Sequence, residues 1–388
     1  MYPKISDLIN DLLGSHINLP IQSYGFMVAM AFVAAGLVVY YELKRKHLQG
    51  LLPFTEKKLV TGQPATTAEI ITSLIFGYFI GLKFFGMFGN YNYFADHPQE
   101  YLLSGQGSQA GGIISGLFFG FLTWYDRHRK RLPKPKTEII KIAPQQLTLN
   151  FLVVAAAFGI LGAKFFDVLE HIDDLVRDPL GTLFSFSGLA FYGGLLIAAI
   201  AVVIYARRND IAWYHIADVA APALMLAYAI GRIGCQLSGD GCWGIPNPNP
   251  KPAWLSFVPD WMWAFDYPHN IINQGIPLPD CTGAHCFVLD QPVFPTPVYE
   301  TLICLLFFLV LWGMRKKLKY AGHLFSIYLV LNGIERFMIE MIRVNHRYTL
   351  TGNLALTQAQ FIALGLIITG VTLYFYFKKQ AITIQYHS

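Results

Sequence analysis

The sequence predicts an all-α fold: a polytopic helical membrane protein with about nine transmembrane helices. Of its 388 residues 54% are hydrophobic and only 14% are charged, a balance that soluble proteins of this length rarely have. Its 30 Phe and 21 Tyr are typical of a membrane body with aromatic residues at both interfaces. Basic residues occur in short runs after apolar segments, which indicates membrane topology signals rather than nucleic-acid binding.

Nine apolar segments have a length suited to membrane helices. They are residues 24–41, 68–88, 111–124, 149–166, 188–205, 216–233, 297–312, 324–341 and 360–377. The residues before the first segment mix charges with apolar positions and lack the apolar core of a signal peptide, so we expect the first helix to be retained. The whole chain, 1–388, is expected to be a single integral membrane domain.

Charge clusters predict the orientation of these helices. Every odd-numbered segment ends in a basic run, such as Lys44-Arg45-Lys46 after the first and Lys378-Lys379 after the ninth. The positive-inside rule places those ends in the cytoplasm, which puts the N-terminus outside and the C-terminus inside. Residues 236–296, with many Pro and four Trp, then form an irregular loop on the outer, periplasmic face.

Two segments of the chain read as internal repeat hairpins, residues 68–131 and 149–208. The sequence from Phe76 to Phe85 recurs in outline from Phe158 to Phe166, and the Gly-Gly pairs at 111 and 193 follow in register. Membrane helices share composition, so chance similarity is the alternative. Two matching motifs occur in the same order and at similar spacing in both segments, which favours a duplication.

Four cysteines fall on the expected oxidising side: Cys235, Cys242, Cys281 and Cys286. One or two disulfides are therefore expected, and the sequence does not distinguish the pairings. A zinc site that includes His285 is the alternative for Cys281 and Cys286. Cys304 lies in an apolar run and is expected to be a packing residue.

Polar residues within the apolar segments fall mostly toward the predicted outer face. They are Tyr24, Lys83, Lys164, Tyr192, Arg232, Tyr299, Glu300, Glu335, Arg336, Glu340 and Arg343. Arg336 and Glu340 are four residues apart, so they share a helix face where they can pair. A single charged residue near a helix end can extend its side chain to the membrane surface. This snorkelling would place charged residues at both ends of a bundle, not at one end alone. The set at one end therefore predicts a pocket for an anionic head group, with arginines on its phosphate.

The stretch from Gly231 to Gly244 carries the most specific signal. An arginine, Arg232, closes the sixth segment, and a glycine-rich loop with Asp240 follows. An arginine there is costly beside lipid and suited to an anion, and glycines let a loop approach a head group. A snorkelling arginine with tight glycine packing is the alternative explanation.

These motifs and their order resemble the prolipoprotein diacylglyceryl transferase family. The resemblance rests on Gly231-Arg232-Ile233-Gly234, the loop that ends in Trp243-Gly244, Tyr192-Gly193-Gly194, Tyr299-Glu300, and Arg336 followed by Glu340 and Arg343. It implies a bacterial inner-membrane enzyme whose site faces the periplasm. Its reaction is expected to move the diacylglyceryl group of phosphatidylglycerol onto the lipobox cysteine of preprolipoproteins, the first step of bacterial lipoprotein maturation. Neither a cofactor nor a metal is expected.

The resemblance and the needs of this chemistry assign roles to thirteen residues. Catalytic roles are predicted for Arg232, Arg336, Asp240, Glu340 and Tyr192. Substrate contacts are predicted for Tyr24, Lys164, Gly193, Gly194, Gly239, Tyr299, Glu300 and Arg343. The two catalytic arginines would stabilise the departing phosphate, because preorganised donors in a water-poor site strongly stabilise developing charge. Proton removal from the thiol would fall to Asp240, Glu300, Glu340 or Tyr192, or to electrostatic activation alone.

Several positions depart from the family pattern. Tyr192 stands where the family usually has histidine, Cys235 replaces an asparagine, Asp240 replaces a glutamate, and the glycine loop is one residue longer. The missing histidine leaves the proton acceptor undefined. It also favours an alternative function, a non-catalytic relative that binds anionic phospholipid or lipoprotein precursors. A transporter is a weaker alternative, because the hairpins run parallel and the segments show no polar cluster at mid-membrane.

Overall fold

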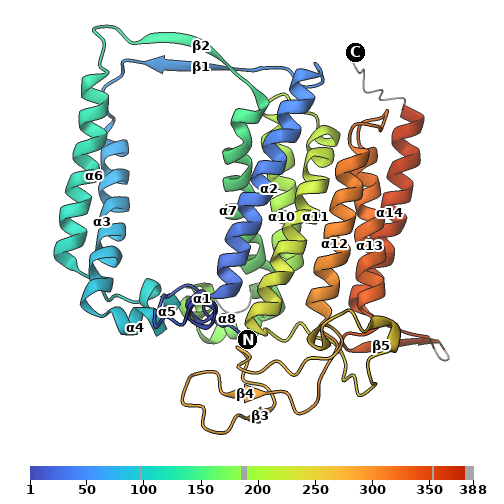
Figure 1. Cartoon of the computed structure of the whole chain (residues 1–388). Coiled ribbons are helices and arrows are strands. Elements are labelled where there is room, and N and C mark those ends of the chain that lie inside the picture. Colours follow the sequence, from blue (N-terminus) through green and yellow to red (C-terminus); the bar gives the residue numbers. More distant parts are fainter. Residues whose placement is uncertain (97, 185–189, 352–353, 381–388) are drawn as a thin grey trace. The chain divides into compact units, whose positions relative to one another are not determined.

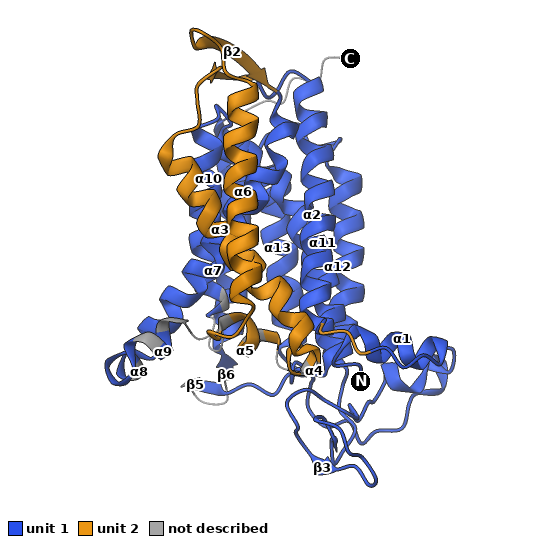
Figure 2. Ribbon diagram, turned by 90° about the vertical axis from the view of Figure 1, so that its left-hand side faces the viewer, with its two compact units in different colours: residues 1–17, 21–53, 143–388 blue, residues 18–20, 54–142 orange. Residues whose placement is uncertain are grey.

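The computed structural model describes residues 1–96, 98–184, 190–351 and 354–380 (Figure 1). Contacts divide the chain into two compact units (Figure 2). Unit 1 comprises residues 1–17, 21–53 and 143–388, and unit 2 comprises residues 18–20 and 54–142. The assignment of the whole chain to one integral membrane domain stays a prediction.

Unit 1 is a bundle whose long helices run vertically in Figure 1. Its long helices are α2 (Ser23–Leu48), α7 (Thr148–Glu170), α10 (Phe191–Arg207), α11 (Trp213–Ser238), α12 (Thr296–Met314), α13 (His323–Ile339) and α14 (Gln358–Gln380). Its short helices are α1 (Ile5–Leu13), α8 (Ile172–Arg177) and α9 (Pro179–Phe184), with 3-10 turns η1 (Pro144–Leu147), η2 (Ala253–Leu255) and η3 (Asp260–Met262). Helix α11 packs against α2 and α12, α13 packs against α14, and α7 packs against α10.

Unit 2 contains one helical hairpin and a ribbon. Helices α3 (Thr67–Gly89) and α6 (Gln109–Arg129) pack together, with α4 (Tyr91–Asp96) and α5 (Pro98–Leu103) between them in the chain. The side chain of Thr66 accepts a hydrogen bond from the Glu69 N–H and so caps α3. Strands β1 (Thr55–Thr61) and β2 (Lys136–Ile142) pair antiparallel, with Thr55 opposite Ile142.

Each hairpin is closed by glycines at its helix contact. In unit 2, a Cβ built on Gly81 would lie 2.3 Å from the Gly111 carbonyl oxygen. In unit 1, a Cβ on Gly162 would lie 2.8 Å from the Gly193 carbonyl oxygen. Backbones that touch in this way require glycine, as is common between membrane helices. The contacts recur at matching positions of the two predicted repeats, although duplication itself stays a prediction.

The structure places a helix at each of the nine predicted segments. Six described helices are long and apolar enough to cross a membrane: α2, α3, α7 together with η1, α11, α12 and α14. Helices α10 and α13 are shorter, at 17 residues each, and α6 also falls outside this group. The chain is therefore a helical membrane protein, whereas the count of nine spans and their orientation stay predictions. Residues 188 and 189, at the start of the predicted fifth segment, lie outside the described residues.

The irregular loop predicted for residues 236–296 begins later, because α11 continues to Ser238. The loop has its own small core, in which Trp243, Tyr267, Leu289 and Val293 are buried together. The all-α prediction missed three two-stranded ribbons. They are β1–β2 in unit 2, β3–β4 (Ile276–Pro277 with Phe287–Val288) in the loop, and β5–β6 (Arg347–Thr351 with Leu354–Thr357) before α14.

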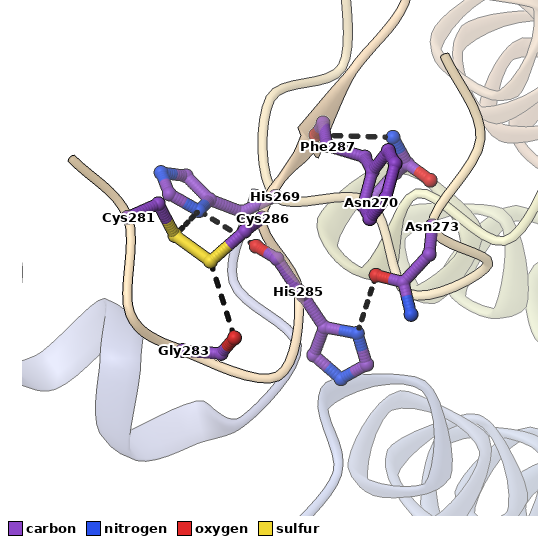
Figure 3. Close-up of a disulfide and its surroundings, with 8 residues drawn as sticks. All are labelled: His269, Asn270, Asn273, Cys281, Gly283, His285, Cys286 and Phe287. Carbon is purple, nitrogen blue, oxygen red and sulfur yellow. Dashed lines mark hydrogen bonds between the residues drawn. A yellow bond between two sulfur atoms is a disulfide. The ribbon is translucent and has the colours of Figure 1, made fainter. Parts of the chain in front are cut away.

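One of the expected disulfides is present, between Cys281 and Cys286 (Figure 3). The imidazole of His285 points away from it, and its Nδ1 lies 3.3 Å from Oδ1 of Asn273. The alternative of a zinc site at this pair is wrong for this structure, since both sulfurs are used in the disulfide. Cys235, Cys242 and Cys304 are free thiols, and Cys304 is fully buried in the bundle core, as expected.

Buried charges occur at both ends of unit 1. At the end where α2 finishes, Lys46 Nζ lies 3.2 Å from Asp218 Oδ2, and Arg315 Nε lies 2.8 Å from Glu42 Oε1. Glu42, Lys46 and Asp218 are each at most 3% exposed. The prediction that the embedded charges gather at one end is therefore wrong. Helices α2 and α11 extend beyond the predicted segments, so charges interpreted as topology signals pack inside the bundle.

Candidate active site

Glu300 is the centre of a group of three arginines at the other end of unit 1. It lies in the first turns of α12 and is fully buried. Arg232, near the end of α11, places Nε 2.9 Å from Glu300 Oε2. Arg336 of α13, and Arg343 just beyond that helix, each place Nη1 3.5 Å from Glu300 Oε1. One carboxylate thus fixes arginines contributed by two other parts of the chain.

The arginines are not fully enclosed. Their side chains are 16% (Arg232), 19% (Arg336) and 13% (Arg343) exposed, whereas Glu300 is 0% exposed. A guanidinium group has five N–H donors, so an ion pair with Glu300 leaves donors for a second anion. The geometry therefore provides several oriented cations for a phosphate-sized group.

Tyr228 also orients Arg232. It lies one helical turn earlier in α11, and its hydroxyl accepts a hydrogen bond from Arg232 Nη2 at 3.3 Å. The same hydroxyl donates to Glu300 Oε1 at 3.4 Å. The Arg232 guanidinium lies over the Tyr228 ring, 5.0 Å from its centroid, which adds a cation–π contact. Tyr228 was missed in the sequence, although its spacing of four residues from Arg232 was a usable signal.

Two further carboxylates lie on α13 or at its end. Arg336 Nη2 is 2.9 Å from Glu340 Oε2, which confirms the predicted pair. The Asn345 amide also donates to Glu340. Glu335 is 1% exposed and lies beside Tyr228, whose hydroxyl already contacts Arg232 and Glu300. The group thus holds three arginines and three glutamates.

The glycine loop turns back onto the end of α11. Gly239 and Gly241 have φ angles of +64° and +86°, in the left-handed region that favours glycine. This reversal returns Cys242 to the side of Cys235, and Asp240 Oδ1 accepts a hydrogen bond from the Cys242 N–H at 3.2 Å. The Arg232 guanidinium reaches the same place, with Nη1 4.0 Å from Cys235 Sγ.

Hydrogen bonds join the rest of the loop to the start of α12 and to the residues just after α13. The Thr296 hydroxyl donates to the Cys242 carbonyl at 2.6 Å, and the Ile245 N–H donates to the Ile342 carbonyl at 2.8 Å. The Tyr299 hydroxyl donates to the Met262 carbonyl at 2.8 Å. The predicted substrate residue Tyr299 therefore has a visible role in fixing the loop.

Two loop side chains have shifted pKa values. A hydrogen bond from Cys235 lowers the pKa of the Cys242 thiol. Burial raises the pKa of Tyr267, whose hydroxyl donates to Gln236 Oε1 at 2.7 Å. The loop therefore contains one thiol that ionises more readily than usual and one tyrosine that stays protonated.

Tyr24 lies beside the end of α11. A Cβ built on Gly234 would lie 3.3 Å from the Tyr24 Cα and 3.0 Å from the Met27 Cβ. Glycine at position 234 therefore lets the start of α2 approach α11 closely. Tyr24 itself is 45% exposed.

The remaining predicted residues lie on α7 and α10. Lys164 Nζ is 3.0 Å from Asp167 Oδ2, one turn along α7. Gly193 packs against Phe166, and a Cβ on Gly194 would lie 2.8 Å from the Gly159 carbonyl. Tyr192, in the first turn of α10, is 41% exposed. The glycine contacts serve helix packing, and the Lys164 pair with Asp167 lies within one helix. The ion pairs that define the arginine group involve other residues, so substrate roles for the four stay predictions.

The fold and this site define a class: a multi-pass helical membrane protein with partly buried arginines and buried glutamates beside a glycine-rich loop at one end of the bundle. The profile of the prolipoprotein diacylglyceryl transferase family matches residues 113–376. The chain belongs to this family. The matched residues include the arginine group and the loop, whereas Tyr24 lies before them.

Several bacterial proteins named phosphatidylglycerol–prolipoprotein diacylglyceryl transferase are similar to this chain. One from Leptospira interrogans is 31% identical over 260 residues, covering 59% of this chain and 70% of the relative. One from Clostridium tetani is 29% identical over 224 residues, covering 57% and 77%. One from Dehalococcoides mccartyi is 30% identical over 235 residues, covering 60% and 78%.

Proposed function

We propose that this protein transfers the diacylglyceryl group of phosphatidylglycerol to the lipobox cysteine of preprolipoproteins. The observation that carries the proposal is the convergence of Arg232, Arg336 and Arg343 on Glu300. The relatives' names supply the reaction, and the arginine group supplies the chemistry that a phosphate leaving group needs. The protein acts within the bacterial inner membrane, with the site facing the periplasm, and its partners are phosphatidylglycerol and the signal peptides of preprolipoproteins.

The first requirement of the reaction is stabilisation of the leaving group. When the glyceryl carbon–oxygen bond breaks, a second negative charge develops on the phosphate. Arg232 and Arg336 are partly exposed and already oriented by Glu300, so they need little rearrangement to meet that charge. Preorganised donors of this kind contribute about 2.7 to 4 kcal/mol each to transition-state stabilisation.

The second requirement is loss of the proton from the attacking thiol. Glu300 and Glu340 already engage arginines, which makes them poor proton acceptors. Asp240 lies in the loop, half-buried, next to two thiols and within the same region as Arg232. We therefore place thiol activation at Asp240 and its neighbours. Tyr192 would need a nearby cation to become a base, since a free tyrosine has a pKa of about 10.

The test uses the full chain purified in detergent. Phosphatidylglycerol and a lipobox peptide are added, and mass spectrometry follows the thioether-linked diacylglyceryl peptide together with released glycerol phosphate. A peptide with serine in place of the lipobox cysteine is the matched control. We expect product only with the cysteine peptide.

The absence of product from a folded sample that still binds the lipid would contradict the proposal. That result would favour the alternative of a non-catalytic relative that binds anionic phospholipid or lipoprotein precursors. The alternative follows from the expectation, taken from the resemblance, that a histidine occupies the position of Tyr192.

A further inference from the structure

Three metal-binding side chains meet where the glycine loop folds over the end of α11. The ligand atoms of Cys235, Asp240 and Cys242 all lie within 4.8 Å of one another. Cys235 is buried, and the other two are half-buried. Two ligands about 2.3 Å from one zinc ion lie about 3.8 Å apart in a tetrahedral site, so the present spacing is within about 1 Å of that geometry.

The donor set selects the kind of metal. Two thiolates favour zinc over magnesium or calcium, which prefer oxygen ligands. A catalytic zinc site commonly has three protein ligands and keeps its fourth position for water or substrate. This cluster offers three, two of them only half-buried. Two thiolates and a carboxylate also exceed the charge of Zn²⁺ by one, and Arg232 lies beside them, 4.0 Å from Cys235 Sγ.

The loop conformation assembles the cluster. Cys235 belongs to the last turn of α11, whereas Asp240 and Cys242 belong to the loop. The left-handed residues Gly239 and Gly241 fold the loop back, and the Thr296 hydroxyl fixes the Cys242 backbone at 2.6 Å. The third free thiol, Cys304, is buried in the bundle core and provides a natural comparison.

We propose that Cys235, Asp240 and Cys242 bind one Zn²⁺ ion, and that the open fourth position takes the thiol of a lipobox cysteine. The inference rests on the proposed function for the identity of that thiol. It replaces the expectation of a cofactor-free enzyme. It also assigns activation of the substrate thiol to three named residues of this chain.

The chemical step balances without a further reactant. The thiol binds zinc as a thiolate and releases its proton to solvent, because a coordinating thiol is deprotonated. The sulfur electron pair then attacks the glyceryl methylene carbon of phosphatidylglycerol, and the carbon–sulfur bond forms as the carbon–oxygen bond breaks. The electron pair of that bond leaves with the phosphate oxygen, giving glycerol phosphate as a dianion. Arg232 lies next to Cys235 and also pairs with Glu300. It therefore connects the proposed zinc ligands, where the thiol binds, with the arginines that stabilise the leaving phosphate.

The first experiment measures metal binding by the full chain in detergent. The protein is loaded with Zn²⁺ without reductant, which keeps the Cys281–Cys286 disulfide intact, and its zinc content is measured by mass spectrometry. We expect about one zinc per chain in the wild type and in Cys304→Ser, and loss of zinc in Cys235→Ser and Cys242→Ser. Thermal unfolding of each variant verifies that it is folded.

The second experiment tests the open position without any transfer reaction. Co²⁺ replaces zinc, because its visible spectrum reports coordination and sulfur ligands. A lipobox peptide is added in the absence of phospholipid, with the serine peptide as control. We expect the cysteine peptide to change the cobalt spectrum and the serine peptide to leave it unchanged.

Three results would overturn the inference. They are a folded wild type that takes up no zinc, a Cys235→Ser/Cys242→Ser double variant that keeps it, and a disulfide between these two cysteines in the protein isolated from membranes. A chelator-treated protein that transfers at the full rate would likewise overturn it, while leaving the proposed function intact. Conversely, zinc and peptide-thiol binding with no transfer from phosphatidylglycerol would support the zinc site and refute the proposed function.

Discussion

Arg232 and Glu300 approach to 2.9 Å between Nε and Oε2, which joins the end of α11 to the start of α12. The pair is asymmetric, because the carboxylate is fully buried whereas the arginine side chain keeps 16% of its surface exposed. Glu300 thus holds Arg232 in place from within the bundle, and the exposed part of Arg232 can bind an additional anion. This division of roles leads to the first two predictions.

Replacement of Arg232 or Arg336 by alanine is expected to lower the rate of diacylglyceryl transfer per folded molecule by about 100- to 1,000-fold, the usual effect of removing one preorganised donor. The matched control is Arg315→Ala, which removes a similarly buried arginine from an ion pair with Glu42 at the opposite end of the bundle. That variant should lose stability and keep its specific rate. Retention of the full rate by both site variants would exclude the assigned roles.

Glu300→Gln is expected to destabilise the protein strongly, by about 3 to 5 kcal/mol, because three arginines lose the carboxylate that faces them. Glu335→Gln is the chemically identical control. Glu335 is also buried, but the ion pairs of the three arginines are with Glu300 and Glu340, so loss of the Glu335 charge should destabilise the protein much less. Thermal unfolding in detergent measures both, and equal effects would contradict this interpretation of Glu300.

Asp218 is expected to be a structural residue. Its carboxylate pairs with Lys46 and accepts hydrogen bonds from the Gly322 N–H at 2.8 Å and the Phe325 N–H at 3.0 Å, at the start of α13. Asp218→Ala should lower thermal stability and leave the transfer rate per folded molecule unchanged. A double-mutant cycle with Lys46→Met measures the coupling. A coupling energy near zero would mean that the two side chains act independently.

Gly162→Ala is expected to destabilise the α7–α10 pair by about 1 to 3 kcal/mol, the usual cost of overpacking. The added methyl group would lie 2.5 Å from the Ile197 Cβ and 2.8 Å from the Gly193 carbonyl oxygen. Gly159→Ala in the same helix is the control, because the nearest atom to its Cβ, Ala198 Cβ, is 3.8 Å away. Thermal unfolding should rank the wild type and Gly159→Ala together, above Gly162→Ala.

Apolar length predicted where the long helices lie, since each needs only a local run of hydrophobic residues. The spacing of Arg336 and Glu340 likewise sufficed to predict their pairing, because a helix places residues four apart on one face. The convergence of the arginines on Glu300 was not predictable in detail. It depends on which faces of α11, α12 and α13 meet, and no local pattern encodes that.

Two other features also required the structure. Lys46 and Asp218 are 172 residues apart in the chain, so their pairing at the second charged end has no local signal. The return of Cys242 to Cys235 depends on the left-handed conformations of Gly239 and Gly241, whereas the sequence allowed either cysteine to form a disulfide. The ion pair and the approach of the two cysteines thus depend on long-range packing and backbone conformation, which the sequence pattern does not show.

The glycine contact between α7 and α10 constrains how a lipid can reach the protein interior. A Gly162 Cβ would collide with the Gly193 carbonyl, and a Gly194 Cβ would collide with the Gly159 carbonyl, so the two backbones touch at these glycines, with the Ile197 and Phe166 side chains packed beside the contact. Where the backbones touch, the side chains beside them have little room to rotate aside and form a gate. If the proposed lipid substrate enters from the bilayer, we expect its acyl chains to pass along the outer edges of this helix pair rather than between its members.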